Sequence, residues 1–162
     1  MASGDTLLIF TALHNEPPSS NFATVSLRNS HMVLAFDAST NESAVFRGVM
    51  PRSYAGGGVT VYIHFSTSVT SGNFDWDVSW ERIGDSQQDL DSDGFAAVNS
   101  ENGTSAPGTS GHVDIVYVTF SNGADMDSVA VGESFRLKIT RDAASDTASA
   151  DAELSAIEIK ET

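Results

Sequence analysis

The chain has 162 residues, of which 40% are hydrophobic and 19% are charged, a composition typical of one folded domain rather than a disordered chain. Asp and Glu total 22 against 8 Lys and Arg, so the net charge of −14 argues against binding to nucleic acid or to anionic lipid. The absence of cysteine excludes disulfides, cysteine zinc sites and thiol catalysis. No apolar run reaches the roughly 18 residues of a membrane span, and the N-terminus lacks the basic start of a signal peptide, so we expect a protein made in the cytoplasm.

Alternation of apolar and polar residues with period two predicts strands along most of the chain. The clearest example is 59–66, where Val59, Val61, Ile63 and Phe65 alternate with mostly polar residues. Turn-forming residues such as Asn29-Ser30 separate neighbouring runs. In chain order the predicted strands are 6–13, 22–28, 31–36, 43–50, 59–66, 74–83, a short one at 94–98, 112–120, 134–140 and 150–160.

Many short strands without a clear helix predict an all-β fold, an antiparallel two-sheet β-sandwich. A jelly roll fits this inventory best, and another Greek-key sandwich is the alternative. We expect one sandwich domain over 21–162, preceded by an N-terminal segment 1–20 that is a candidate arm reaching onto a neighbour. The polar stretch 84–111 is predicted to be a long loop of the functional or interfacial kind, and 143–152 an exposed turn.

Two predicted strands, 6–13 and 112–120, are apolar on both faces. A strand of that kind must cover its second face with something, because exposed apolar patches usually mark contacts. Another subunit and the loop 84–111 are the two candidates. In 112–120 one face carries Val113, Ile115 and Tyr117, and the other carries Val116, Val118 and Phe120.

The sharpest local motif is Asp89, Asp91 and Asp93 followed by Gly94. Oxygen ligands at alternate positions with glycine next resemble the start of a calcium-binding loop. The twelfth position is Ser100 instead of the expected glutamate, and no amphipathic helix flanks the segment. The motif therefore predicts a candidate calcium site at these three carboxylates, with an acidic surface turn as the alternative.

Nothing in the sequence predicts an enzyme. The four histidines, His14, His31, His64 and His112, have no metal-ligand spacing, and no serine lies in a nucleophile motif. The pair Asp75 and Asp77 is expected by chance in so acidic a chain. We therefore predict no catalytic residue and no bound cofactor apart from the candidate calcium ion.

Aromatic residues point to a core more than to a ligand platform. Trp76 and Trp80 share a strand face with Phe74 and Val78, while acids occupy the opposite face, so both tryptophans are predicted to be core residues. Tyr54, Tyr62 and Tyr117 are better candidates for exposed aromatics, although in the sequence they form no row.

The segments 28–66, 75–83, 135–142 and 151–162 resemble small β-rich structural proteins of tailed bacteriophages, the jelly-roll decoration or cement proteins. This resemblance implies a homotrimer on the outer capsid surface of the virion, where it stabilises contacts between major capsid protein subunits. The residues themselves leave two alternatives open. One is a phage fibre or carbohydrate-binding module that recognises a host glycan, and the other is a cupin-type enzyme, which would need closely spaced histidines.

Overall fold

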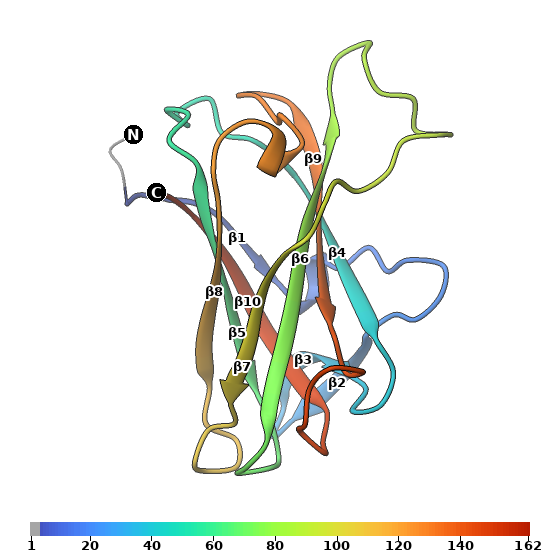
Figure 1. The fold of residues 1–162 in the computed structure, drawn as a ribbon, viewed down its shortest axis with the longest axis vertical. Coiled ribbons are helices and arrows are strands. Elements are labelled where there is room, and N and C mark those ends of the chain that lie inside the picture. The colour runs from blue at the N-terminus through green and yellow to red at the C-terminus, as the bar shows by residue number, and fades with distance from the viewer. Residues whose placement is uncertain (1–3) are drawn as a thin grey trace.

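Two antiparallel sheets pack face to face in the computed structural model, which describes residues 4–162 (Figure 1). This architecture confirms the predicted all-β sandwich. The single-turn helices are η1 (Ala12–His14) and η2 (Ala124–Met126). The strands are β1 (Thr6–Thr11), β2 (Thr24–Arg28), β3 (His31–Phe36), β4 (Glu42–Val49), β5 (Val59–Ser66), β6 (Asn73–Ile83), β7 (Asn99–Ser105), β8 (Asp114–Phe120), β9 (Ser134–Arg141) and β10 (Ala152–Glu161).

Sheet A has six strands and sheet B has four. Sheet A runs in the order β2-β3-β10-β5-β8, and β1 also pairs with β10. The first half of β10 pairs with β3 and its second half with β1, so these two strands share one edge of β10. Sheet B runs β4-β9-β6-β7. Within residues 4–162 no helix is long or apolar enough to cross a membrane.

The core lies between the sheets and is rich in aromatic side chains. Trp76 and Trp80 on β6 are fully buried, which confirms their prediction as core residues. The Trp76 ring centroid lies 5.3 Å from that of Phe36 on β3, in the edge-on arrangement that aromatic pairs prefer. Trp80 packs at 4.8 Å against Phe135 on β9. Burying each such side chain stabilises the fold by about 1.5–3 kcal/mol.

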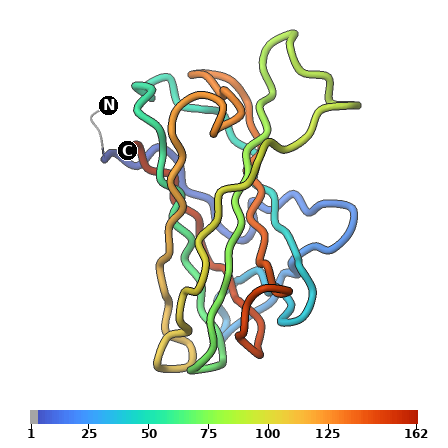
Figure 2. The backbone as a smooth tube through the Cα atoms, viewed as in Figure 1, coloured from blue at the N-terminus to red at the C-terminus, as the bar shows by residue number. Residues whose placement is uncertain are grey.

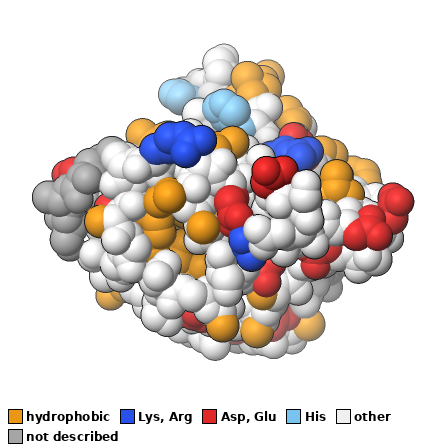
Figure 3. Space-filling model, turned by 90° about the horizontal axis from the view of Figure 1, so that it is seen from above, with side chains coloured by type: hydrophobic (Ala, Val, Ile, Leu, Met, Phe, Trp, Pro, Cys, Tyr) orange, Lys and Arg blue, Asp and Glu red, His pale blue; other side chains and the backbone are white. Residues whose placement is uncertain are grey.

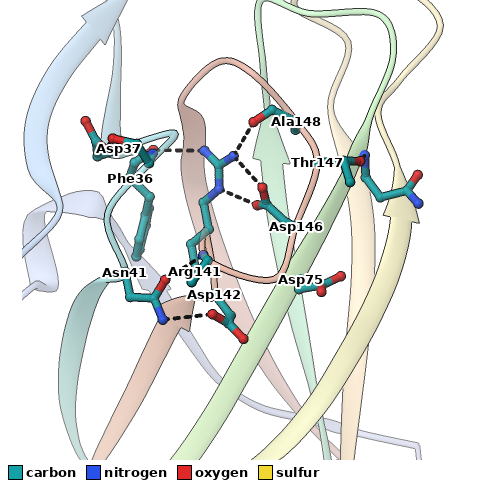
Figure 4. A network of polar contacts seen from close by, with 12 residues as sticks. Phe36, Asp37, Asn41, Asp75, Arg141, Asp142, Asp146, Thr147 and Ala148 are labelled. Carbon is teal, nitrogen blue, oxygen red and sulfur yellow. Dashed lines mark hydrogen bonds and ion pairs between the residues drawn. The ribbon is translucent and has the colours of Figure 1, made fainter.

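A buried ion pair closes one end of sheet B. The guanidinium of Arg141 is fully buried and donates to both carboxylate oxygens of Asp146 (Figure 4). It also donates to the carbonyl oxygens of Phe36, Ala148 and Ala150. The predicted exposed turn at 143–152 is therefore only partly exposed, because Asp146 and Ala148 point inward to serve Arg141.

The strand β7 differs from the prediction, which placed a short strand at 94–98 and a loop through 111. Residues 99–105 pair with β6 instead, although they carry no hydrophobic side chain. Their pairing is supported by two carboxylates of β6: Asp77 accepts from the Ser100 hydroxyl, and Asp75 accepts from the Gly103 N–H at 2.6 Å. Asp75 and Asp77 therefore help to hold an edge strand in place.

Most of the described N-terminal residues lie in the sandwich. Of the segment 1–20 expected as an arm, 6–11 form β1 in sheet A and Phe10 and Ala12 belong to the core. The chain then projects sideways as a loop before β2 (Figure 1). Residues 1–3 lie outside the described part of the chain.

Acid is expected to destabilise the fold partly through Glu133. A hydrogen-bonded ion pair with Arg82, at 2.6 Å, holds the pKa of Glu133 below its ordinary value of 4.5. A carboxyl whose pKa is depressed in the folded state stabilises it above the unfolded pKa, and that contribution is lost as pH falls through the folded pKa. The unfolding free energy measured by urea titration should thus fall below about pH 4.5, and the fall should be shallower in Glu133→Gln. An unchanged slope in that variant would contradict the role of Glu133.

Candidate functional site

The outer face of sheet A, which points away from sheet B, carries aligned side chains from four strands. In one row Ile9 of β1, Glu158 of β10, Tyr62 of β5 and Tyr117 of β8 are register partners. The next row holds Thr11, Ala156, His64 and Ile115 in the same strand order. We call these eight residues the tyrosine face. The odd-numbered neighbours on β5 and the even-numbered neighbours on β8 point into the core, which forces these side chains outward.

The two tyrosines form a cross-strand pair at the centre of this face. Their ring centroids are 5.9 Å apart and the rings are tilted by 48°. Tyr117 is 56% exposed, and Tyr62 is half-buried beside it. Such a pair offers a broad, nearly rigid apolar surface whose hydroxyls remain free to hydrogen-bond in water.

A cavity of about 490 Å³ lies at one end of the same sheet face, where β5, β8 and β10 meet the β2–β3 hairpin. The ion pair of Arg28 and Glu153 lies beside it, with the Arg28 guanidinium also donating to the Ser110 hydroxyl at 3.0 Å. The walls of the cavity combine apolar and hydroxyl-bearing side chains: Val33, Val113, Ser66, Ser110 and Ser155. A small polar molecule would meet both hydrogen-bonding groups and apolar contacts there.

Four residues along each chain segment separate this cavity from the tyrosine pair: Tyr62 to Ser66 on β5, and Tyr117 on β8 to Val113 just before that strand. At about 3.4 Å per residue, the separation is about 14 Å. His64 and Ile115 occupy the interval. The cavity and the tyrosine face therefore form one elongated surface that follows the strands.

Nothing within residues 4–162 covers this surface. Val113, Ile115 and Tyr117 are each more than half exposed, although their strand is apolar on both faces as predicted. The long loop 84–98 extends from the top of the sandwich and away from β8 (Figure 2). Of the stretch 84–111 only its end, at Ser110 and Gly111, reaches the cavity. Of the two expected covers, the loop 84–111 therefore does not cover this face, and cover by another subunit stays a prediction.

The charge of this surface differs from that of the whole chain. Arg28 at the cavity is neutralised by its ion-pair partner Glu153. Glu158 of the tyrosine face lies two residues from Lys160, which is in the adjoining row on the same side of β10. The surface is therefore close to neutral in a chain whose net charge is −14. The local charges therefore create no strong electrostatic potential of one sign that would favour a charged ligand over a neutral one.

Of the three tyrosines predicted to be exposed, Tyr62 and Tyr117 are on the surface and Tyr54 is not. Tyr54 is buried, and its hydroxyl accepts from the Gly58 N–H at 3.0 Å. Burial raises the pKa of Tyr54. The prediction for Tyr54 was wrong because no period-two pattern surrounds it, so the sequence indicates nothing about its direction.

A second cavity, of about 320 Å³, is lined by the segments 54–56, 122–123 and 128–131. These segments lie at the upper end of the sandwich in Figure 1, the end that faces the viewer in Figure 3. Tyr54, Asn122 and Val129 are among its lining residues, and none of that lining is charged. Over this end hydrophobic, acidic and basic side chains are interspersed rather than gathered (Figure 3). It offers no exposed aromatic row comparable to the tyrosine face.

Asp89, Asp91 and Asp93 lie in the exposed loop after β6. The Asp89 carboxylate accepts from the Asp91 N–H at 3.0 Å, as in an ordinary turn. Among residues 4–162 no three His, Asp or Glu side chains converge as a metal site would require. Calcium binding by these three carboxylates stays a prediction.

A calcium ion held by Asp89, Asp91 and Asp93 should stabilise the fold by mass action. Adding a chelator should then lower the melting temperature measured by circular dichroism. Added calcium should restore it in the natural sequence and not in Asp91→Asn. Equal melting temperatures with and without the chelator would eliminate a structural ion.

Comparison with known proteins places the fold but not the family. No protein-family model matches the chain, and no curated protein matches its sequence. A family 35 carbohydrate binding module from an environmental isolate has a TM-score of 0.53 at 12% identity, over 96% of this chain and 94% of that one. The xylan-binding module CBM15 has a TM-score of 0.51 at 9% identity, over 96% and 97%.

A third structure, the CBM36-1 domain of a multidomain xylanase from the hindgut metagenome of Trinervitermes trinervoides, has a TM-score of 0.50 at 9% identity, with 96% and 97% covered. At such identities the likeness establishes the two-sheet sandwich that all these chains share. These three structures are carbohydrate-binding modules by name.

Proposed function

We propose that this chain is a non-catalytic carbohydrate-binding domain whose binding surface is the tyrosine face together with the adjoining cavity at Arg28. The observation that carries the proposal is the pair of the half-buried Tyr62 and the exposed Tyr117 on an uncovered sheet face. The C–H-bearing faces of a sugar ring pack on aromatic rings, while its hydroxyls need hydrogen-bonding partners at the edge. The tyrosine face supplies the aromatic rings, and the cavity supplies the hydrogen-bonding partners through Arg28 and the hydroxyls of Ser66, Ser110 and Ser155.

The ligand of this surface is a neutral, extended glycan. A chain of several sugar units spans the distance of about 14 Å between the tyrosine pair and the cavity. The Arg28–Glu153 pair at the cavity is neutral, Glu158 has Lys160 nearby on β10, and the net charge of −14 repels polyanions. Uronate-rich or sulfated polysaccharides are therefore poorer ligands than neutral ones.

Electrophoresis in native gels that contain a soluble polysaccharide tests the proposal. Xylan, mannan and a mixed-linkage β-glucan serve as neutral probes, and polygalacturonate serves as the anionic contrast. At least one neutral polymer should retard the protein relative to a gel without polymer, and polygalacturonate should not. Unchanged mobility in all the neutral gels would contradict carbohydrate binding.

A specific observation also supports a second function, capsid decoration by a self-associating protein. The exposed apolar side chains Ile115 and Tyr117 lie on β8, the edge strand of sheet A, and Val113 directly precedes it. An apolar patch of this kind is also what a subunit interface buries. In that function a trimer would bind the outer surface of a phage head and stabilise it by mass action.

Mass determination in solution separates the two functions. A monomer that is retarded by a neutral polysaccharide supports carbohydrate binding through an open face. A trimer that sediments with undecorated phage heads, and that dissociates in Ile115→Ser, supports decoration.

A further inference from the structure

A second cleft lies on the opposite side of the molecule, on the outer face of sheet B. Its volume is about 440 Å³. The walls come from two projecting loops, which contribute Asn21 and Phe95, and the floor comes from the strands β4, β6 and β9. We call this the Phe95 cleft; its lining residues on the strands are Ser43, Asp77, Lys138 and Thr140.

The two charged side chains of this cleft, Asp77 and Lys138, do not pair with each other. Asp77 and Lys138 project from neighbouring strands to the same side of sheet B, because Val78, Leu137 and Ile139 between them point into the core. Within residues 4–162 no ion pair joins Asp77 to Lys138 or to any other residue. One carboxylate oxygen of Asp77 accepts from the Ser100 hydroxyl, which leaves the other for a ligand.

An aromatic ring completes the cleft. The Lys138 ammonium nitrogen lies 4.6 Å from the centroid of the Phe95 ring, and the Arg136 guanidinium carbon lies 4.9 Å from it. These cation–π contacts fix the ring against the sheet. Phe95 is only half-buried and presents an apolar surface beside an acceptor, a donor and the hydroxyls of Ser43 and Thr140.

We propose that the Phe95 cleft is a second carbohydrate-binding site that takes a neutral sugar unit, so that the domain binds two glycans on opposite faces. A vicinal diol fits the pair of charges, with one hydroxyl donating to Asp77 and its neighbour accepting from Lys138, while the sugar ring lies along Phe95. One carboxylate and one ammonium make the cleft neutral, which excludes a preference for ionic sugars. The choice of ligand class rests on the proposed function of the tyrosine face.

Isothermal titration with neutral trisaccharides (xylotriose, mannotriose and cellotriose) tests the second site. The natural sequence should show two binding events per chain for at least one of them. Tyr62→Ala/Tyr117→Ala should retain one event, and Asp77→Asn/Lys138→Met should retain the other. Asparagine still accepts from Ser100, so β7 is kept in place, and equal melting temperatures would verify that both variants fold.

The matched control is Arg47→Met, which removes one positive charge from an exposed side chain of the same sheet outside the cleft. It should retain both events. A single event that the tyrosine variant abolishes and the Asp77/Lys138 variant keeps would overturn the second site and leave the proposed function standing. No binding of any trisaccharide or of the polysaccharides by the natural sequence would overturn both.

Discussion

Replacing Arg141 with methionine should lower the free energy of unfolding by about 3–5 kcal/mol, the range typical when one partner of a buried ion pair is removed. The variant leaves the Asp146 carboxylate, whose side chain is 1% exposed, without its cation. It also removes the donor from the carbonyl oxygens of Phe36 and Ala148 (Figure 4) and from that of Ala150. Unpaired buried acceptors each add a desolvation cost. Urea unfolding at pH 7 measures the difference.

Two further variants make this result specific to the ion pair. Arg47→Met removes an exposed arginine from sheet B and should change stability by less than about 0.5 kcal/mol. Arg141→Met/Asp146→Leu replaces both charges by apolar groups and should recover a large part of the loss. A loss of unfolding free energy below about 1 kcal/mol in Arg141→Met would be typical of an exposed ion pair, and it would contradict the burial of the Arg141 network.

Replacing both tyrosines of the tyrosine face with alanine should remove the binding of the neutral polysaccharide at this face and leave only the binding that the Phe95 cleft supplies. Central aromatic anchors each contribute about 2 kcal/mol or more to a binding surface. A loss of that size corresponds to more than tenfold in Kd for each tyrosine. Stability should change little because Tyr117 is 56% exposed.

The controls for this result separate stacking from general loss of surface. Leu90→Ala removes an exposed apolar side chain from the loop 84–98 and should leave binding unchanged. Tyr62→Phe/Tyr117→Phe keeps both rings and should retain most of the affinity. Binding of the double alanine variant at the level of the natural sequence would place the ligand elsewhere.

The sequence predicts the fold well because the core strands are strictly periodic. In 59–66 and 134–140 the apolar residues face the core as the pattern indicates, and the polar residues between them point to the outer face, where Thr60 and Ser66 are buried. The strand β7 lacks such a signal, since its residues Asn99–Ser105 are polar or glycine. It is held in place by hydrogen bonds that it donates to the carboxylates of Asp75 and Asp77 on β6. Edge strands of this type are specified by tertiary contacts, which a single sequence does not display.

The candidate site is less accessible to sequence reasoning than the fold. Tyr62 and Tyr117 are 55 positions apart in the numbering and meet only because β5 and β8 are neighbours in register. Strand order cannot be read from alternation, so the row was invisible although each tyrosine was predicted to be exposed. The same holds for the Phe95 cleft, which is assembled from two loops and three strands.

The apolar second face of 112–120 was the most informative sequence signal. It predicted that something must cover Val113, Ile115 and Tyr117, and these side chains are uncovered within the described chain. The proposed glycan and the proposed subunit contact use this same surface. An oligomer that buries Tyr117 would therefore compete with glycan binding.

Chemical-shift mapping by nuclear magnetic resonance tests the tyrosine face most directly. The labelled natural sequence is titrated with xylohexaose, mannohexaose and cellohexaose in turn. Our account predicts that, with at least one of them, amide signals in β5, β8 and β10 shift progressively, with the largest changes near Tyr62 and Tyr117. Shifts that leave these strands untouched and appear only at the loops around Tyr54 or Asp89, or no shifts with any of the three, would contradict it.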